Sequence, residues 1–198
     1  MTRKLFFTSD THYSHENIIK YSNRPFANAD EMNEAMIANW NKTVSKSDIV
    51  WHLGDVAFEK DRNKLIGILE RLNGEKHLIW GNHERALKSV PWSRYFHTAN
   101  DMRVLNVPPD QNDGKAQRIV LCHYAMRVWD QSHYGTWQLY GHSHGTLPDD
   151  PNLLACDVGV DCWDYTPVSM AQLNDLMSKK TFKPFIPRDF GDRLKIPT

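Results

Sequence analysis

The first half of the chain alternates short apolar runs with longer amphipathic stretches. The runs are residues 4–9, 48–53 and 77–80, and a short apolar run bounded by polar residues or glycine is typical of a buried strand. Between the second and third runs, residues 61–72 place leucine and isoleucine side chains on one side of a helix. This order of strand, helix and strand predicts parallel βαβ units.

A longer helix is expected after Asn28. The segment from Asn28 to Glu31 resembles a capping box, in which the N-cap side chain bonds a helix amide and the glutamate reaches back to the N-cap amide. An apolar residue then recurs at every fourth position, namely Met32, Met36, Trp40 and Val44. We interpret this stripe as core rather than as a cofactor contact.

The second half of the chain is richer in predicted strands. Residues 103–107 and 117–122 flank a loop with prolines and a glycine, which predicts a hairpin. The remaining predicted elements are two strands, at residues 137–140 and 153–160, and a last helix at residues 169–180. We therefore expect one α/β domain over residues 1–180 and a tail at residues 181–198 that lies on the surface or is mobile.

The composition limits the classes of protein to consider. The 198 residues carry 24 basic and 24 acidic side chains, so strong non-specific nucleic-acid binding, which depends on phosphate neutralisation, is not expected. No apolar run is long enough for a membrane span or a signal peptide. The cysteines lack Cys-x-x-Cys spacing, which favours the cytoplasm over an oxidising compartment. We expect all three to be buried as small hydrophobic residues: Cys122, Cys156 and Cys162.

Histidine, aspartate and asparagine residues gather directly after the predicted strands. The set is Asp10, His12, Asp55, Asn82, His83, His123, His142 and His144. A lone histidine among them is more often a core or surface residue, but we expect the whole set to converge at the strand ends. Imidazole nitrogen combined with carboxylate or amide oxygen suits manganese, iron, cobalt, nickel or zinc better than magnesium or calcium.

The chain resembles the calcineurin-like metallophosphoesterase family. The resemblance rests on Asp10-x-His12, Gly54-Asp55, Gly81-Asn82-His83-Glu84, His123 and Gly141-His142-x-His144, in that order. It implies an α/β fold of two packed mixed β-sheets flanked by helices. It also implies two divalent transition-metal ions, manganese before iron, zinc, cobalt or nickel.

The resemblance further implies a role for each of these residues. Asp10, His12, Asp55 and His144 would hold one metal ion, and Asp55, Asn82, His123 and His142 the other, with Asp55 shared. His83 would contact the phosphate and protonate the leaving oxygen as a general acid. Glu84 is expected to orient its turn. His15 and His52 are expected to be ordinary core or surface histidines, with support of a ligand as the alternative for His52. Asp157 and Asp161 are expected in turns or at strand ends, with support of a ligand as the alternative.

The implied activity is a phosphodiesterase or phosphomonoesterase in which a hydroxide held by two metals attacks a small nucleotide-like substrate. Two alternatives remain open, a nuclease acting on DNA or RNA and a non-catalytic interaction protein on the same fold. The residues that flank the motif loops are candidates for substrate contact: Asn17, Arg24, Arg85, Arg127 and Trp129. We expect a phosphorylated small molecule as partner, no membrane, and a cytoplasmic location, and the oligomeric state stays open.

Overall fold

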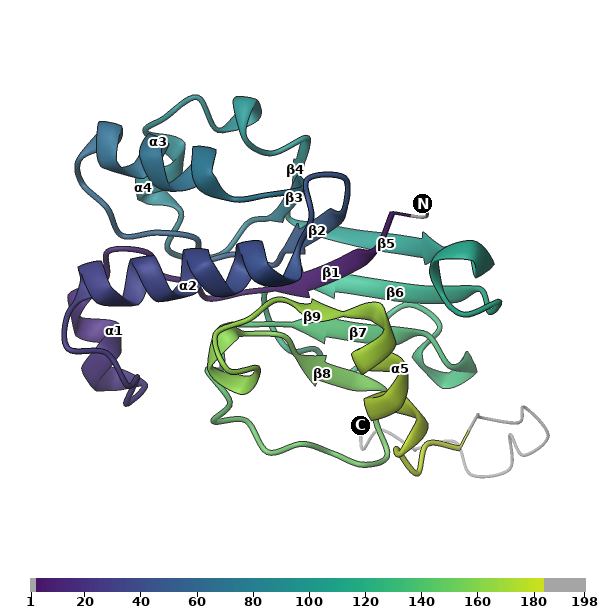
Figure 1. The fold of residues 1–198 in the computed structure, drawn as a ribbon. Helices are drawn as coiled ribbons and strands as arrows, with labels where there is room; N and C mark the ends of the chain where they lie inside the picture. The colour runs from purple at the N-terminus through teal and green to yellow at the C-terminus, as the bar shows by residue number, and fades with distance from the viewer. Residues whose placement is uncertain (1–2, 184–198) are drawn as a thin grey trace, which may run out of the picture.

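Two β-sheets pack face to face, and helices cover the outer face of the first (Figure 1). The structure is a computed structural model, and it describes residues 3–183. The first sheet has the strand order β4-β3-β2-β1-β9, and the second has the order β5-β6-β7-β8. The predicted α/β architecture of two mixed sheets flanked by helices is confirmed.

Parallel strands form most of the first sheet, as the sequence predicts. The strands are β1 (Leu5–Thr8), β2 (Ile49–His52), β3 (Glu75–Ile79), β4 (Thr98–Asn100) and β9 (Val168–Ser169). Strands β1 to β4 run parallel in sequence order, and β9 is antiparallel to β1. Strand β3 begins earlier than predicted, while β4 and β9 are short edge strands that the hydrophobic pattern did not indicate.

The second sheet combines a hairpin with a parallel section. It consists of β5 (Met102–Val107), β6 (Gln117–Cys122), β7 (Trp137–Tyr140) and β8 (Ala155–Asp157). Strands β5 and β6 are antiparallel, as the predicted hairpin requires, and β6, β7 and β8 are parallel. Strand β8 is shorter than the predicted 153–160 because a 3₁₀ turn over Val160–Cys162 follows it.

The helices predicted after Asn28, over residues 61–72 and over residues 169–180 are present, but one capping detail is wrong. They are α2 (Ala29–Thr43), α3 (Arg62–Arg71) and α5 (Met170–Ser178), and the structure also has the short helices α1 (Glu16–Tyr21) and α4 (Arg85–Lys88). Asn28 accepts the amide of Glu31 at 2.9 Å, as an N-cap should. The Glu31 carboxylate, however, accepts the amide of Ala27 at 2.8 Å instead of closing the box. A complete capping box occurs at α5, between Ser169 and Gln172.

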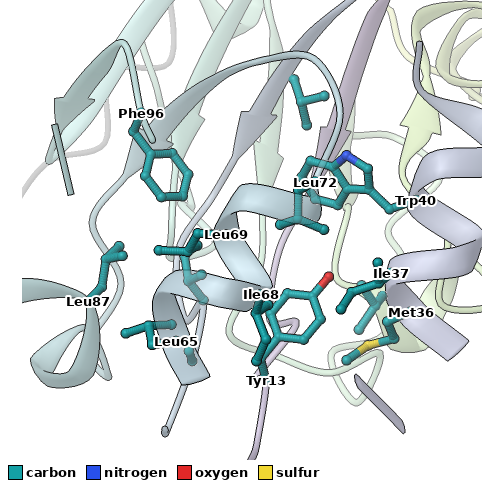
Figure 2. Packing of buried hydrophobic residues seen from close by; sticks show 14 of the residues in the cluster. Tyr13, Met36, Ile37, Trp40, Leu65, Ile68, Leu69, Leu72, Leu87 and Phe96 are labelled. Carbon is teal, nitrogen blue, oxygen red and sulfur yellow. The ribbon is translucent and has the colours of Figure 1, made fainter. Parts of the chain in front are cut away.

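The alternation of side chains along β1 separates two hydrophobic cores. Phe6 packs under the helices, whereas Leu5 and Phe7 point into the space between the sheets, because successive side chains of a strand face opposite ways. Figure 2 shows the first core, where Trp40 of α2 faces the leucine and isoleucine stripe of α3. The predicted apolar stripe of α2 is therefore core.

The cysteines and the tail differ in part from expectation. Cys122 and Cys156 are free and buried, but Cys162 is exposed, so its predicted burial is wrong. The predicted tail at residues 181–198 lies outside the described residues except for its first three, of which Thr181 donates its amide to the Pro151 carbonyl at 2.8 Å. Within residues 3–183, no helix is both long and apolar enough to cross a membrane.

Backbone contacts beyond the strand ends join the carboxyl-terminal edges of the two sheets. The amide of His12 donates to the Asp55 carbonyl at 3.0 Å, which links the segments after β1 and β2. The amide of Val160 donates to the Ser9 carbonyl at 3.0 Å, which links the segment after β1 to the one after β8. The loops at this edge therefore form one cluster, the usual position of ligand sites in parallel sheets.

Candidate metal centre

The loops after β1, β2, β6 and β7 bring two groups of possible metal ligands together. Asp10, His12 and His144 form one group, and Asp55, His123 and His142 form the other. In each group the ligand atoms lie within 4.8 Å of one another. The two groups agree with the two ligand sets expected from the sequence, and the assignment of each residue as a ligand stays a prediction.

The backbone at this edge is held in an uncommon conformation. Five of the candidate ligands have left-handed φ angles: Asp10 at 57°, His12 at 48°, Asp55 at 57°, His142 at 68° and His144 at 47°. Non-glycine residues adopt this region infrequently, and each such residue costs free energy that the surrounding structure must supply. Strain concentrated on several residues of one cluster is typical of a functional site.

Asp55 belongs to the second group and also faces the first. Its Oδ1 atom accepts the amide of His83 at 2.8 Å. Its Oδ2 atom lies 3.5 Å from Nε2 of His12 and 3.6 Å from Nε2 of His123. One carboxylate oxygen thus faces a histidine from each group, which is the arrangement a shared ligand needs.

The carboxylate of Glu84 holds the backbone at Asp55. Its Oε1 atom accepts the amide of Asp55 at 2.5 Å and the amide of Gly81 at 3.4 Å, so it ties the segments after β2 and β3 together. Burial, followed by the charge of Asp55, raises the pKa of Glu84 to about 7. The expected role of Glu84 in orienting its turn agrees with these contacts.

The unpartnered polar atoms of the first group fit a cation. Asp10 accepts the amide of His142 at 2.9 Å through Oδ2, but its Oδ1 is buried without a hydrogen-bond partner in the described chain. Both ring nitrogens of His12 are likewise buried without one. Burial raises the pKa of Asp10 to about 8 and lowers the pKa of His12 far below its usual range. A neutral imidazole and a carboxyl that lacks a counter-charge are the donors that a divalent ion would complete.

The second group fits a cation for a different reason. His123 Nδ1 lies 2.7 Å from the Leu53 carbonyl, so this nitrogen carries the proton and donates it. Its Nε2 atom then presents a lone pair, yet it lies 2.9 Å from Oδ1 of Asn82. A cation bound beside this contact would accept the imidazole lone pair and the amide oxygen together. Asn82, expected as a ligand, therefore belongs to the cluster by geometry.

Residues outside the two groups hold candidate ligands in place. Asp161 Oδ2 lies 2.7 Å from Nδ1 of His144, which leaves Nε2 of that ring for a ligand role. His52 accepts the amide of Gly54 at 3.2 Å and contacts the hydroxyl of Thr11 at 3.0 Å. His52 is thus a supporting residue behind two ligand loops, as one interpretation of the sequence allowed, and burial lowers its pKa to about 3.

A cleft opens beside the cluster. It encloses about 630 Å³, and its lining includes Asn82, His83, Phe58, Lys60 and Arg85. The exposed ring of His83 lies 5.8 Å from the His12 ring and 4.9 Å from the Phe58 ring, measured between centroids. His83 therefore faces both the candidate ligands and the cleft, which is where a proton donor to a bound substrate would stand.

The residues proposed for substrate contact lie in different surroundings, and one of them lines the cleft. Arg85 lines the cleft beside His83. Asn17 and Arg127 are exposed but lie outside that lining. Arg24 is buried and bonded to protein groups, and Trp129 is buried with its indole nitrogen bonded to the Thr136 carbonyl at 2.8 Å. The expectation that Arg24 grips substrate does not agree with its place in the fold.

Sequence reasoning missed the partners of several site residues. His15, expected to be an ordinary core or surface histidine, stacks its ring on Phe58 with centroids 3.8 Å apart and 9° between the planes. For Asp161, support of a ligand was the less favoured alternative, and the structure shows that contact. Phe58 carries no motif, so only its position three residues after Asp55 could have indicated it.

The two packed sheets and the cluster of candidate ligands at their shared edge are typical of metallophosphoesterases, and comparison with known families agrees. The family model described as calcineurin-like phosphoesterase matches residues 3–173. The chain belongs to the calcineurin-like phosphoesterase family.

Its relatives extend over nearly the same length. An uncharacterized protein of Methanocaldococcus jannaschii is 34% identical over 183 residues, covering 89% of this chain and 93% of that protein. The gene 66 protein of Mycobacterium phage L5 is 26% identical, covering 87% of this chain and 93% of that protein. Among solved structures, a protein of unknown function from Aquifex aeolicus shares the fold, with a TM-score of 0.68 and 24% identity over 88% of this chain and all of that chain.

Proposed function

We propose that the protein is a metal-dependent phosphoesterase that hydrolyses a small phosphodiester or phosphomonoester of nucleotide-like character. The observation that carries the proposal is the position of Asp55 Oδ2, 3.5 Å from one histidine of the first group and 3.6 Å from one of the second. A carboxylate placed between two ligand sets is the arrangement of a two-metal site. The metal chemistry of the family supports a pair of transition metals, with manganese as our choice.

The side chains of the cluster would each contribute one atom to this centre. Asp10, His12, Asp55 and His144 would hold the first ion, and Asp55, Asn82, His123 and His142 the second. When bound, such ions neutralise phosphoryl oxygens and lower the pKa of a coordinated water. The chain itself supplies the geometry, because the left-handed backbone and the contacts of Glu84, His52 and Asp161 fix where the ligands point.

His83 acts as the general acid in this proposal. It lies next to a candidate ligand, stays exposed to the cleft, and has its backbone amide bonded to Asp55 at 2.8 Å. Protonation of the leaving oxygen is the task for a histidine at such a place. The ring of Phe58 limits the space around His83 on one side.

The cleft indicates the size and charge of the substrate. Its volume of about 630 Å³ is within the range of sites that bind small molecules. Phe58 offers an apolar wall, and the basic residues Lys60 and Arg85 offer charge to a phosphorylated ligand, with Glu59 as the opposing charge. The balanced net charge of the whole chain supports a small substrate over a long nucleic acid. The free cysteines support a reducing compartment such as the cytoplasm.

A substrate panel tests the proposal. The purified protein is assayed with Mn²⁺ on p-nitrophenyl phosphate, its bis ester, 2′,3′-cyclic nucleotides and short DNA, with EDTA as the metal-free control. Hydrolysis of a small ester that depends on Mn²⁺ and is lost in EDTA is the expected result. Turnover of DNA alone would replace this function with a nuclease, and no turnover of any substrate by the Mn²⁺-loaded protein would overturn the enzyme assignment.

A further inference from the structure

Arg24 is an arginine whose side chain has no solvent exposure. Its Nε atom donates to Oδ1 of Asp161 at 2.8 Å, and its Nη2 atom donates to Oδ2 of the same carboxylate at 2.9 Å. This two-pronged pairing satisfies a charge that would be costly to bury alone. The residues lie 137 positions apart in the chain, so the pair joins the segment after α1 to the one after β8.

The carboxylate held by Arg24 also orients His144. Oδ2 of Asp161 lies 2.7 Å from Nδ1 of the His144 ring. A proton on Nδ1 that donates to a carboxylate leaves Nε2 with its lone pair and fixes the plane of the ring. Arg24 therefore acts on the direction of a candidate ligand through one intervening side chain.

The same guanidinium holds the backbone of the ligand loop after β1. Nη2 of Arg24 donates to the Asp10 carbonyl at 2.7 Å, and Nη1 donates to the Thr11 carbonyl at 3.0 Å. These two carbonyls lie between Asp10 and His12, both of which have left-handed φ angles. Bonds to the carbonyls on this strained stretch keep Asp10 and His12 directed into the cluster.

The geometry assigns to Arg24 the role of a positioning residue for the first metal site, acting through Asp161 on His144 and through backbone carbonyls on Asp10 and His12. This inference rests on the proposed metal centre. It is selective, because the side-chain hydrogen bonds of Arg24 within residues 3–183 go to Asp161, to the Asp10 and Thr11 carbonyls and to the Met32 sulfur. None of these bonds goes to Asn82, His123 or His142.

The planar fork of arginine is needed for this role. Four N–H donors in fixed directions reach a carboxylate and two carbonyls at once, and a lysine ammonium cannot span the same acceptors. Loss of a residue that supports metal ligands typically lowers metal affinity by about 10–100-fold. Arg24→Met should therefore weaken the first site by about that factor and leave the second near its wild-type affinity.

Calorimetric titration of EDTA-stripped protein with Mn²⁺ tests the inference. His12→Ala and His142→Ala identify the two sites, since each removes a candidate ligand of one group. The affinity lost in Arg24→Met should be the one lost in His12→Ala. If Arg24→Met does not fold by circular dichroism, Arg24→Lys replaces it with the same expectation. A loss shared equally by both sites, or found at neither, would overturn the positioning role.

Two further variants separate positioning from general stability. Arg71 makes the same two-pronged contact with Glu34 at an exposed position, both bonds at 2.6 Å, so Arg71→Met is the matched control and should keep both affinities. In the double variant of Arg24→Met with Asp161→Asn, the fold loss of Mn²⁺ affinity should be smaller than the product of the two single losses. The reason is that both residues act on His144 through the same series of contacts. A loss equal to the product would overturn the path through Asp161. Wild-type protein that binds no Mn²⁺ would instead overturn the proposed function itself.

Discussion

The Oδ2 atom of Asp55 lies 3.5 Å from the Nε2 atom of His12. His123 approaches the same oxygen from the opposite group, at 3.6 Å, while the other carboxylate oxygen is occupied by the amide of His83. Asp55 is 1% exposed, so water does not compensate its charge. A buried carboxylate between two histidine nitrogens is a position that bound cations would complete.

Replacement of Asp55 should remove both metal sites together. Asp55→Ala is expected to lower Mn²⁺ affinity by more than about 100-fold at each site, beyond the range reached by residues that only support ligands. Isothermal titration calorimetry measures both affinities. Asp110→Ala, at an exposed aspartate away from the cluster, is the control. Retention of one full-affinity site in Asp55→Ala would contradict the shared role.

Replacement of His83 should separate catalysis from metal binding. His83→Ala is expected to lower kcat by about 10²–10⁴-fold, the contribution of a positioned general acid. Mn²⁺ stoichiometry should stay as in wild type, because His83 is in neither group of ligand atoms. Steady-state kinetics and calorimetry on the same preparation provide both readouts.

The exposed His97 supplies the matched control for that variant. His97→Ala should leave kcat and metal content unchanged, since this residue precedes β4 at the opposite side of the sheet from the cluster. If His83→Ala lost metal in proportion to its loss of rate, His83 would be a ligand and the acid would have to be sought elsewhere.

Removal of metal should lower the thermal stability of the protein. Asp10 and His12 have buried atoms without hydrogen-bond partners in the described chain, and a bound ion would satisfy them only in the folded state. Mn²⁺ at 100 times its Kd stabilises a folded protein by about 2.7 kcal/mol. For a chain of this size, that corresponds to a rise in Tm of about 5–11 °C.

Scanning calorimetry with Mn²⁺ and with excess EDTA measures this difference in Tm. Asp55→Ala should show a much smaller difference, because it lacks the shared ligand. A wild-type Tm that EDTA leaves unchanged, in protein shown to bind Mn²⁺, would mean that the unfolded chain binds the ion as tightly as the folded protein, and would contradict a site that only the fold assembles.

Much of the fold could be predicted because the information is local. Apolar runs with intervening amphipathic stretches predicted β1, α3 and β3, and the ligand residue types directly follow the strands that position them. The short strands β4 and β9 could not be found this way. The sequence Thr98-Ala99-Asn100 has no apolar pattern and becomes a strand because it pairs with β3.

The supports of the site were harder to predict, because they depend on contacts between distant segments. Arg24 was a candidate for substrate contact, since an arginine beside a motif loop is equally suited to a phosphate and to a buried carboxylate. The deciding fact is the position of Asp161, far away in the chain. The role of Glu84 was easier to predict, because Glu84 belongs to the Gly81-Asn82-His83-Glu84 motif and contacts the neighbouring strand end.

The close approach of two loops at Gly54 leads to a last prediction. Gly54 has a φ of 101°, and a Cβ atom there would lie 2.6 Å from the Gly81 nitrogen and 2.7 Å from Nδ1 of His123. Both contacts are shorter than van der Waals distance, and the φ angle disfavours any side chain. Gly54→Ala should therefore destabilise the protein by about 2–4 kcal/mol through strain and overpacking.

The same substitution at Gly67 should have the opposite sign. Gly67 lies inside α3, and a Cβ atom there would meet nothing within 4 Å. Gly67→Ala should stabilise the protein by about 0.5–1 kcal/mol, because alanine loses less conformational entropy in a helix. Urea unfolding of both variants measures the two changes, and Mn²⁺ titration should show weakened binding only in Gly54→Ala, where His123 is displaced. Equal stability of the two variants would mean that the loops after β2 and β3 are not in contact, and the shared position of Asp55 would then be lost with them.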